Sequence, residues 1–236
     1  MQIAVVLLKG VFPGVKAALP LVLGLFPIGI AFGLAARALG FGLLFTSLLS
    51  LAVYAGASQF VGIALMAAAA SVPEVALTTF IINLRHALMG SSLSIYLRRA
   101  PRPLLPILAF GLTDESYALS FPLFASGKAN AWYLLGVELV CYLSWNAGTL
   151  AGHWGGEVLP SAVRESMAFT LPAMFIALLA ILVRNRLGLA VAAFSALVST
   201  GLFLGGVSGL NVVVVGVVGA TFGLLLERWG GKWKSP

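Results

Sequence analysis

The chain has 236 residues, of which 61% are hydrophobic and 9% charged, and its mean hydropathy is +1.07. Soluble domains carry roughly 25% charged residues, so this composition excludes an ordinary soluble protein and predicts an all-α polytopic integral membrane protein. The apolar residues come in continuous runs, which excludes a membrane β-barrel. The net charge of +7 does not indicate a nucleic-acid partner, because most basic residues lie in short loops, where they set membrane orientation.

The pattern predicts about six to eight hydrophobic segments in one transmembrane domain that covers residues 1–236. Residues 1–16 form an N-terminal arm and residues 227–236 a basic tail. The candidate segments are residues 17–36, 43–70, 75–97, 104–125, 131–152, 167–183, 187–205 and 210–226. Pro20 and Pro27 predict kinks or an interruption in the first of them. The single cysteine, Cys141, permits neither an internal disulfide nor a cysteine metal cluster.

The basic residues predict the orientation. Eight full crossings would place Arg98, Arg99 and Arg102 outside, against the positive-inside rule. If segments 43–70 and 131–152 are instead re-entrant from the outer side, ten basic residues lie inside, Arg85 lies within the membrane, and three lie outside, namely Arg37, Lys128 and Arg164. This arrangement predicts cytoplasmic termini in a bacterial inner membrane, with breaks at residues 56–59 and 146–149. Eight crossings with an imperfect charge rule are the alternative.

An internal repeat of about 92 residues is a further hypothesis. It pairs Ala55-Gly56-Ala57 with Ala147-Gly148-Thr149, and residues 77–88 with residues 169–180. Transporters often contain repeats with the binding site between them. The alternative is chance identity, because Ala, Gly and Leu are common throughout.

Asn83, Arg85 and His86 lie inside an otherwise apolar run. Ionisable groups at such a depth cost roughly 2.5–3.5 kcal/mol each and persist where they face the bundle interior or a wet cavity. Asn83 and His86 fall on one helical face, and the long side chain of Arg85 can swing toward them. The three residues predict a functional site or, alternatively, a structural contact with a neighbouring segment.

Two adjacent acids, Asp114 and Glu115, lie near the centre of segment 104–125. We expect one of them, or else Glu138, to pair with Arg85 and another to take up a proton, since burial disfavours a charged carboxyl group. Alternatively the segment is shifted and the acids lie at the membrane interface. Glu138 and Asn146 lie on a polar stripe of segment 131–152, which predicts either a cavity wall or hydrogen bonds between helices.

Tyr54, Ser58 and Gln59 lie beside Gly56, where freed backbone groups would suit the carboxylate or ammonium of a small zwitterion. Packing of helices through small residues is the alternative. The predicted substrate-binding residues are therefore Tyr54, Gly56, Ser58, Gln59, Asn83, His86 and Asn146. No nucleotide-binding, zinc-protease or serine-hydrolase motif occurs, so we predict no cofactor, no metal and no catalytic residues.

The chain resembles the AzlC-type family, the large subunit of bacterial branched-chain amino acid exporters. The matching stretches are residues 27–35, 54–60, 83–86, 111–115 and 173–179, in the family's order; the most specific are Ala-Gly-Ala-Ser-Gln-Phe at 55–60 and Asn-Leu-Arg-His at 83–86. One departure is Phe169, which follows Ala168 where an aspartate is expected. The resemblance implies export of valine, leucine, isoleucine or similar amino acids. Methionine is a further expected substrate, because an apolar pocket discriminates by only about 1–3 kcal/mol per methylene. The resemblance also implies a small AzlD-type membrane subunit as partner.

Two functional hypotheses follow. In the first, the chain is a secondary exporter of branched-chain amino acids, coupled to protons through Asp114, Glu115 or His86 and dependent on the AzlD-type partner. In the second, it is a channel or scaffold whose intramembrane polar residues are structural. Trans-stimulation of transport separates the two, because a carrier shows it and a pore does not.

Overall fold

The computed structural model describes residues 10–155, 160, 176, 179–180, 183, 185–206 and 211–229, and every regular element among them is a helix. The elements are α2 (Phe12–Ala38), α3 (Leu43–Leu48), the π-helix η2 (Leu49–Val53), α4 (Gly56–Ala67), α5 (Val72–Ser94), the 3-10 helix η3 (Arg102–Leu104), α6 (Leu105–Gly111), α7 (Asp114–Ala125), α8 (Ala131–Gly155), α11 (Arg186–Leu204) and α12 (Asn211–Trp229). The all-α prediction is confirmed. Of the described helices, α2, α8 and α11 are long and apolar enough to cross a membrane.

Some predictions fall on residues outside the described part of the chain. These are the arm up to residue 9, the tail from residue 230, nearly all of the segment 167–183, and Phe169 within it. The second half of the proposed 92-residue repeat, residues 169–180, lies there too, apart from residues 176, 179 and 180.

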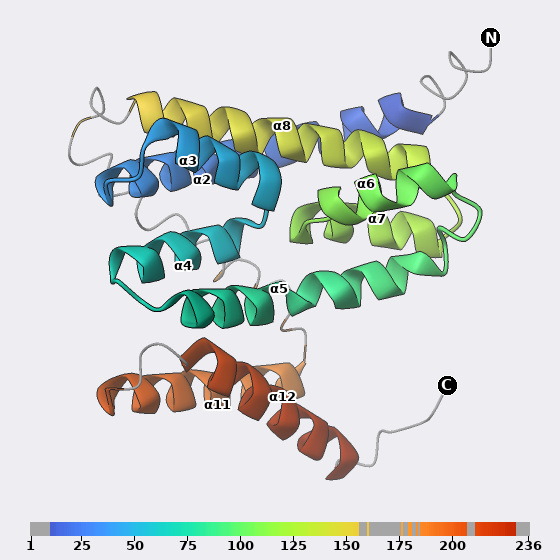
Figure 1. Ribbon diagram of the computed structural model, residues 1–236. Coiled ribbons are helices and arrows are strands. Elements are labelled where there is room, and N and C mark those ends of the chain that lie inside the picture. The colour runs from blue at the N-terminus through green and yellow to red at the C-terminus, as the bar shows by residue number, and fades with distance from the viewer. Residues whose placement is uncertain are drawn as a thin grey trace.

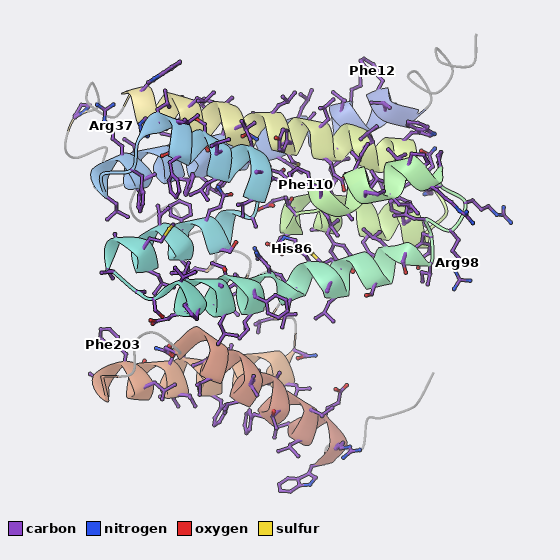
Figure 2. The ribbon with its side chains drawn as sticks, viewed as in Figure 1. Phe12, Arg37, His86, Arg98, Phe110 and Phe203 are labelled. Atoms are coloured by element: carbon purple, nitrogen blue, oxygen red, sulfur yellow. The ribbon has the colours of Figure 1, made fainter. Side chains whose placement is uncertain are left out.

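The long helices run between two ends of the molecule (Figures 1 and 2). Phe12 and Arg98 lie at one end, which we call the Arg98 end, and Arg37 and Phe203 lie at the other, the Arg37 end. Helices α2 and α8 both run from the Arg98 end to the Arg37 end, and α5 runs from the Arg37 end to the Arg98 end. With 23 residues, α5 is about 35 Å long at 1.5 Å per residue.

Helices α2 and α8 pack backbone against backbone along their whole length. A Cβ atom added to Gly29 of α2 would lie 2.6 Å from the carbonyl oxygen of Trp145 and 3.2 Å from Cα of Gly148. Small residues let helices approach this closely, and close van der Waals packing is a main source of helix association in membranes. Helix α2 continues through Pro20 and Pro27, so the predicted interruption is absent; membrane helices tolerate proline where neighbouring groups satisfy the freed carbonyls.

Segment 131–152 is not broken at residues 146–149, contrary to the prediction, because α8 runs continuously from Ala131 to Gly155. The polar side chains in this stretch bond to their own helix: Asn146 Nδ2 donates to the Tyr142 carbonyl at 2.9 Å, and Thr149 Oγ1 donates to the Trp145 carbonyl at 3.0 Å. Gly148 does not form a turn; its lack of a side chain lets α8 approach α2 closely. Segment 131–152 therefore crosses the molecule and is not re-entrant.

Among the described residues, two of the predicted segments are interrupted, 43–70 and 104–125. In the first, η2 ends at Val53, Tyr54 is left-handed with φ 45°, and α4 begins at Gly56. The break thus lies at Tyr54 and Ala55, and the predicted break at residues 56–59 is instead the first turn of α4. In the second, α6 ends at Gly111 and α7 begins at Asp114. The chain enters from the Arg37 end through α3 and η2 and returns to that end through α4. Helices α6 and α7 likewise enter from the Arg98 end and return to it (Figure 1).

The elements repeat with an offset of 58 or 59 residues rather than about 92. Helix α4 begins at residue 56 and α7 at residue 114, while α5 begins at residue 72 and α8 at residue 131. Each half consists of a broken helix pair followed by a long helix, and the halves point in opposite directions (Figure 1). This is the inverted arrangement found in many secondary transporters. The 92-residue pairing is wrong in structure at Ala147-Gly148-Thr149, because those residues lie inside a continuous helix.

Helices α11 and α12 form a separate antiparallel pair beside α5. The rings of Phe194 and Phe222 stack with centroids 4.0 Å apart, and Gly219 packs against Ser195. No described residue of α11 is buried. The pair therefore presents a broad apolar surface.

Candidate functional site

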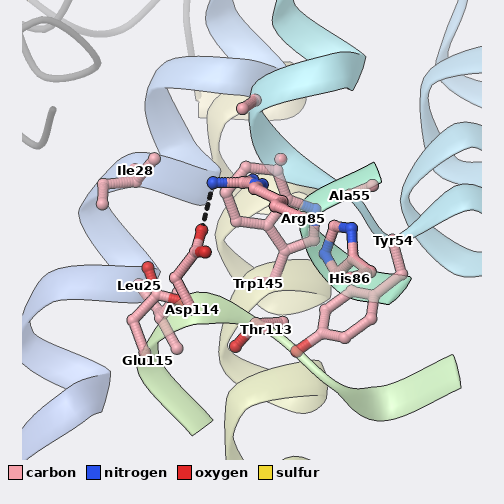
Figure 3. A pocket seen from close by; sticks show the side chains of 12 residues that line it. Leu25, Ile28, Tyr54, Ala55, Arg85, His86, Thr113, Asp114, Glu115 and Trp145 are labelled. Carbon is pink, nitrogen blue, oxygen red and sulfur yellow. Dashed lines mark ion pairs between the residues drawn. The ribbon is translucent and has the colours of Figure 1, made fainter. Parts of the chain in front are cut away.

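The two breaks meet at one small central cavity, so the N-termini of α4 and α7 face the same point from opposite ends of the molecule (Figure 3). The cavity holds about 30 Å³. It is lined by Leu25, Ile28, Tyr54, Ala55, Gly56, Ala57, Arg85, His86, Thr113, Asp114, Glu115 and Trp145. Each helix N-terminus presents backbone N–H groups and a partial positive charge. The cavity therefore combines two such ends with a cation, an imidazole and two carboxyl groups.

An ion pair between Arg85 and Asp114 crosses the cavity (Figure 3). The two side chains are 29% and 22% exposed. Asp114 and Glu115 form the first turn of α7, where the helix dipole favours negative charge. The structure therefore brings Arg85 together with the acid pair, whereas Glu138 lies elsewhere. The pair also ties α5, the long helix of the first half, to the break of the second half.

His86 lies beside Tyr54 on the opposite side of Arg85 from the acids (Figure 3). Its Nδ1 is 3.2 Å from the carbonyl oxygen of Asn83, one turn earlier on α5. Asn83 itself does not line the cavity. The two residues lie one turn apart on α5, as predicted from their spacing, but only the imidazole of His86 reaches the cavity.

Ser58 and Gln59 hold the break in place and do not line the cavity. Gln59 Oε1 accepts from the backbone N–H of Ala55 at 3.1 Å, and Gln59 Nε2 donates to Ser50 Oγ at 3.3 Å. Ser58 Oγ donates to the Ala55 carbonyl at 2.9 Å. Both side chains are 2% exposed. They therefore satisfy the backbone groups that the missing helical turn leaves open, which is a structural role.

Asn146 and Glu138 also lie away from the central cavity. Asn146 bonds to its own helix. Glu138 is buried in the wall of a second cavity between α6 and α8. Of the eleven predicted site residues, the structure therefore gathers six at the centre: Tyr54, Gly56, Arg85, His86, Asp114 and Glu115.

Sequence reasoning missed the second break and the residue that forms it. Thr113 caps α7: its Oγ1 accepts from the Ser116 N–H at 3.2 Å, and Ser116 Oγ accepts from the Thr113 N–H at 2.9 Å. A threonine followed three residues later by a residue that caps in return is a known helix-start signal. Thr113-Asp114-Glu115-Ser116 was therefore a readable N-terminus in the middle of segment 104–125. Leu25, Ile28 and Trp145 complete the wall, and only the packing of α2 and α8 places them there.

Three cavity-lining residues each hold a buried donor that has no hydrogen-bond partner within the described part of the chain: Tyr54 Oη, Arg85 Nε and Trp145 Nε1. Unpaired buried donors are rare in native structures and each requires an explanation. All three can donate a hydrogen bond, and α4 has no side-chain cap at its N-terminus. The cavity is therefore rich in donors suited to an anionic group, with carboxylates of its own beside them.

The helices and their polar centre define an all-α integral membrane protein with two interrupted helices that meet inside it. The profile of the AzlC family, described as "AzlC protein", matches residues 20–159. The chain belongs to this family. The match covers α4, α5, α6, α7 and α8, together with most of α2, and so includes every residue of the central cavity.

Individual relatives extend this likeness over nearly the whole chain. It is 35% identical to the inner membrane protein YgaZ of Escherichia coli over 94% of this chain and 91% of that protein. An uncharacterized membrane protein of Archaeoglobus fulgidus is 34% identical over 93% of this chain and 94% of its own length. The branched-chain amino acid transport protein AzlC of Bacillus subtilis is 29% identical over 67% of this chain and 62% of its own length. No solved structure matches the chain.

Proposed function

We propose that this chain is the transporting subunit of a secondary exporter of branched-chain amino acids, with the central cavity as its substrate site. The main support is the meeting of two half-helix N-termini at a cavity that also holds Arg85, His86 and two acids. Half-helix N-termini bind the carboxylate of the substrate in other secondary transporters. The relative from Bacillus subtilis that is named for branched-chain amino acid transport supports the substrate class.

A zwitterion matches the groups at the cavity. Its carboxylate would accept from the unpaired donors of Tyr54 and Trp145 and from the uncapped start of α4. Its ammonium would compete with Arg85 for Asp114, the first residue of α7. The apolar side chains of Leu25 and Ile28 would contact the branched side chain. Selection among valine, leucine, isoleucine and methionine would be modest, since one methylene is worth only about 1–3 kcal/mol in an apolar pocket.

The cavity volume favours an alternating-access mechanism. Ligand sites usually measure about 300–1,000 Å³, and the central cavity, at about 30 Å³, has room only for water-sized molecules. We therefore assign this structure to a closed conformation. The two inverted halves, each with its own broken helix, would open the site toward the Arg37 end or the Arg98 end in turn.

The proposed orientation in the membrane rests on the distribution of the basic residues. Of the nine described Lys and Arg residues, five lie at the Arg98 end: Arg98, Arg99 and Arg102 in its loop, Lys16 near the start of α2, and Lys128 just after the end of α7. Arg37 lies at the opposite end and Arg85 at the centre. The positive-inside rule makes the Arg98 end cytoplasmic. The sequence-based charge count placed Lys128 outside. Because α7 returns to the Arg98 end, Lys128 instead belongs on the cytoplasmic side in this proposal.

Proton coupling is the finer part of the proposal. Asp114 pairs with Arg85, while Glu115, next to it on α7, lines the same cavity without an ion pair in the described structure. A proton taken up by Glu115 at the outer side and released inside would supply the driving force for export. Substrate efflux that is unchanged after collapse of the proton gradient would remove this step alone.

The AzlD-type partner would bind to the pair formed by α11 and α12. Gly201 and Gly216 have open space around them, so they can admit a close partner helix. Gly219 and Gly223 contact Ser195 and Val191 of α11 instead, so they are not available to a partner helix. Gly209 lies outside the described residues. Equal transport by the chain alone and by the co-expressed pair would contradict the need for a partner.

The test of the main proposal is counterflow in proteoliposomes that contain the co-purified pair. Valine inside the vesicles should accelerate uptake of labelled leucine, and Asp114→Asn should abolish this trans-stimulation. Flux without trans-stimulation would favour the alternative of a channel, and absence of any amino acid flux would favour a scaffold.

A further inference from the structure

A second cavity, of about 300 Å³, lies between α6 and α8. It is lined by Ile107, Phe110 and Gly111 of α6 and by Leu135, Glu138, Leu139 and Tyr142 of α8; we call it the Glu138 groove. Most of this wall is apolar, and Glu138 is its charged residue. The volume lies at the lower limit of ordinary ligand sites, so the groove, unlike the central cavity, has room for a molecule as large as an amino acid.

Glu138 has no partner within the described chain. The residue is 3% exposed, and neither carboxyl oxygen has a hydrogen-bond donor. Tyr142, the residue of the groove that carries a hydroxyl group, donates it to the Leu51 carbonyl at 2.9 Å, so this group is engaged elsewhere. Arg85 is engaged by Asp114. A carboxylate buried among apolar side chains is strongly disfavoured unless a cation or donors accompany it.

Gly111 brings the end of α6 directly against this carboxyl group. A Cβ atom at Gly111 would lie 2.6 Å from Glu138 Oε2 and 2.9 Å from its Cδ. Glycine therefore leaves the space that the carboxyl group occupies. The last carbonyl groups of a helix lack intrahelical donors and carry partial negative charge. Glu138 and the end of α6 thus both favour a positively charged ligand.

Along α8, the groove lies between the Arg98 end and the central cavity. Glu138 is seven residues from the start of α8 and Trp145 fourteen, so along the helix axis they are ~10 Å and ~20 Å from that end. The Tyr54 ring separates the two cavities: it lines the central one and contacts Tyr142 and Phe110, with centroids 4.9 and 5.9 Å away.

We propose that the Glu138 groove is a binding subsite for the primary ammonium group of a hydrophobic amine, with the carboxylate of Glu138 as its counter-ion. The inference rests on the proposed function: the subsite receives the amino acid from the cytoplasmic side before the substrate passes Tyr54. The ammonium contacts Glu138, and the branched side chain contacts Ile107, Leu135 and Leu139.

The test uses the full chain in nanodiscs of phosphatidylcholine, a lipid without a primary amine. The probe is 3-methylbutylamine, which is leucine without its carboxylate, and 4-methylpentanoate, which lacks the amine, is the matched comparison. Calorimetry should show binding of the amine and not of the acid. Glu138→Gln keeps the shape of the side chain and should weaken amine binding about 10- to 100-fold, the value of a charge-assisted hydrogen bond. Glu74→Gln, in the first turn of α5, should change nothing.

Unchanged amine affinity in a folded Glu138→Gln variant would overturn the proposal, as would equal binding of the acid. If Glu138→Gln fails to fold, Leu139→Trp decides. Leu139 is 46% exposed, so the protein should still fold with a larger side chain at this position. The tryptophan ring should fill the groove and abolish amine binding. Retained binding in that variant would also overturn the subsite. Valine counterflow by the co-purified pair in proteoliposomes is a separate readout: amine binding without counterflow would support the subsite and contradict the exporter.

Discussion

The guanidinium of Arg85 on α5 forms an ion pair with the carboxylate of Asp114, the residue that begins α7. The two residues belong to opposite halves of the inverted arrangement, so their contact ties one half to the break of the other. In the proposed alternating-access mechanism, this partly exposed pair would hold the closed conformation together and would break when the halves move apart.

We expect Arg85→Gln and Asp114→Asn each to lower thermal stability, because each leaves the other charge without its partner. The double variant should recover part of the loss, with a coupling energy of about 0.5–3 kcal/mol, as for other residues in contact. Size-exclusion chromatography after heating in detergent measures this. Arg98→Gln, at a loop position that makes no ion pair in the described structure, is the control. Strictly additive losses would show that the pair contributes no stability.

Gly148→Ala should destabilise the protein far more than Gly24→Ala. A Cβ atom at Gly148 would lie 3.0 Å from the Ile30 nitrogen and 3.1 Å from Cα of Gly29, so α2 and α8 would have to separate. A Cβ atom at Gly24, which lies on α2, would meet nothing within 4 Å. Overpacking typically costs about 1–3 kcal/mol. The yield of folded protein and its melting temperature provide the measurement, and similar values for both variants would contradict the described packing.

Single cysteines at Arg99 and Lys128 should both resist an impermeant thiol reagent applied to intact cells, whereas Leu39→Cys should react. The background is Cys141→Ala, which removes a thiol that is 0% exposed. Because α7 returns to the Arg98 end, Lys128 is expected on the same side as Arg99. Labelling of Lys128→Cys with protection of Arg99→Cys would contradict the hairpin of α6 and α7. Labelling of both would reverse the orientation.

Gln59→Ala and Tyr54→Phe should fail in different ways. Gln59→Ala deprives the Ala55 N–H of its buried acceptor, which costs about 1–3 kcal/mol, so the amount of folded protein should fall with KM for leucine unchanged. Tyr54→Phe removes a hydroxyl that has no partner in the described structure. Folding should therefore be intact and KM should rise. A raised KM in a well-folded Gln59→Ala variant would place that amide in the substrate site after all.

The sequence alone determined the class of protein, because hydropathy depends on composition and on the length of apolar runs. It also indicated the family and the central residues Arg85, His86, Asp114 and Glu115, since charges inside an apolar segment are costly wherever the segment packs. The interruption near Tyr54 was readable as well, to within two to four residues, from small and polar residues at the middle of a long segment.

Only the tertiary structure decided which second segment is broken and which polar residues reach the cavity. Asn146 and Thr149 suggested a break, yet they bond to their own helix while the backbone of α2 packs against Gly148. Ser58 and Gln59 suggested substrate contacts, yet they satisfy the backbone at Ala55. A polar side chain can bond to its own backbone, to a neighbouring helix or to a ligand with similar energy. The choice among these depends on which groups the packed helices bring within reach, and sequence spacing does not contain that information.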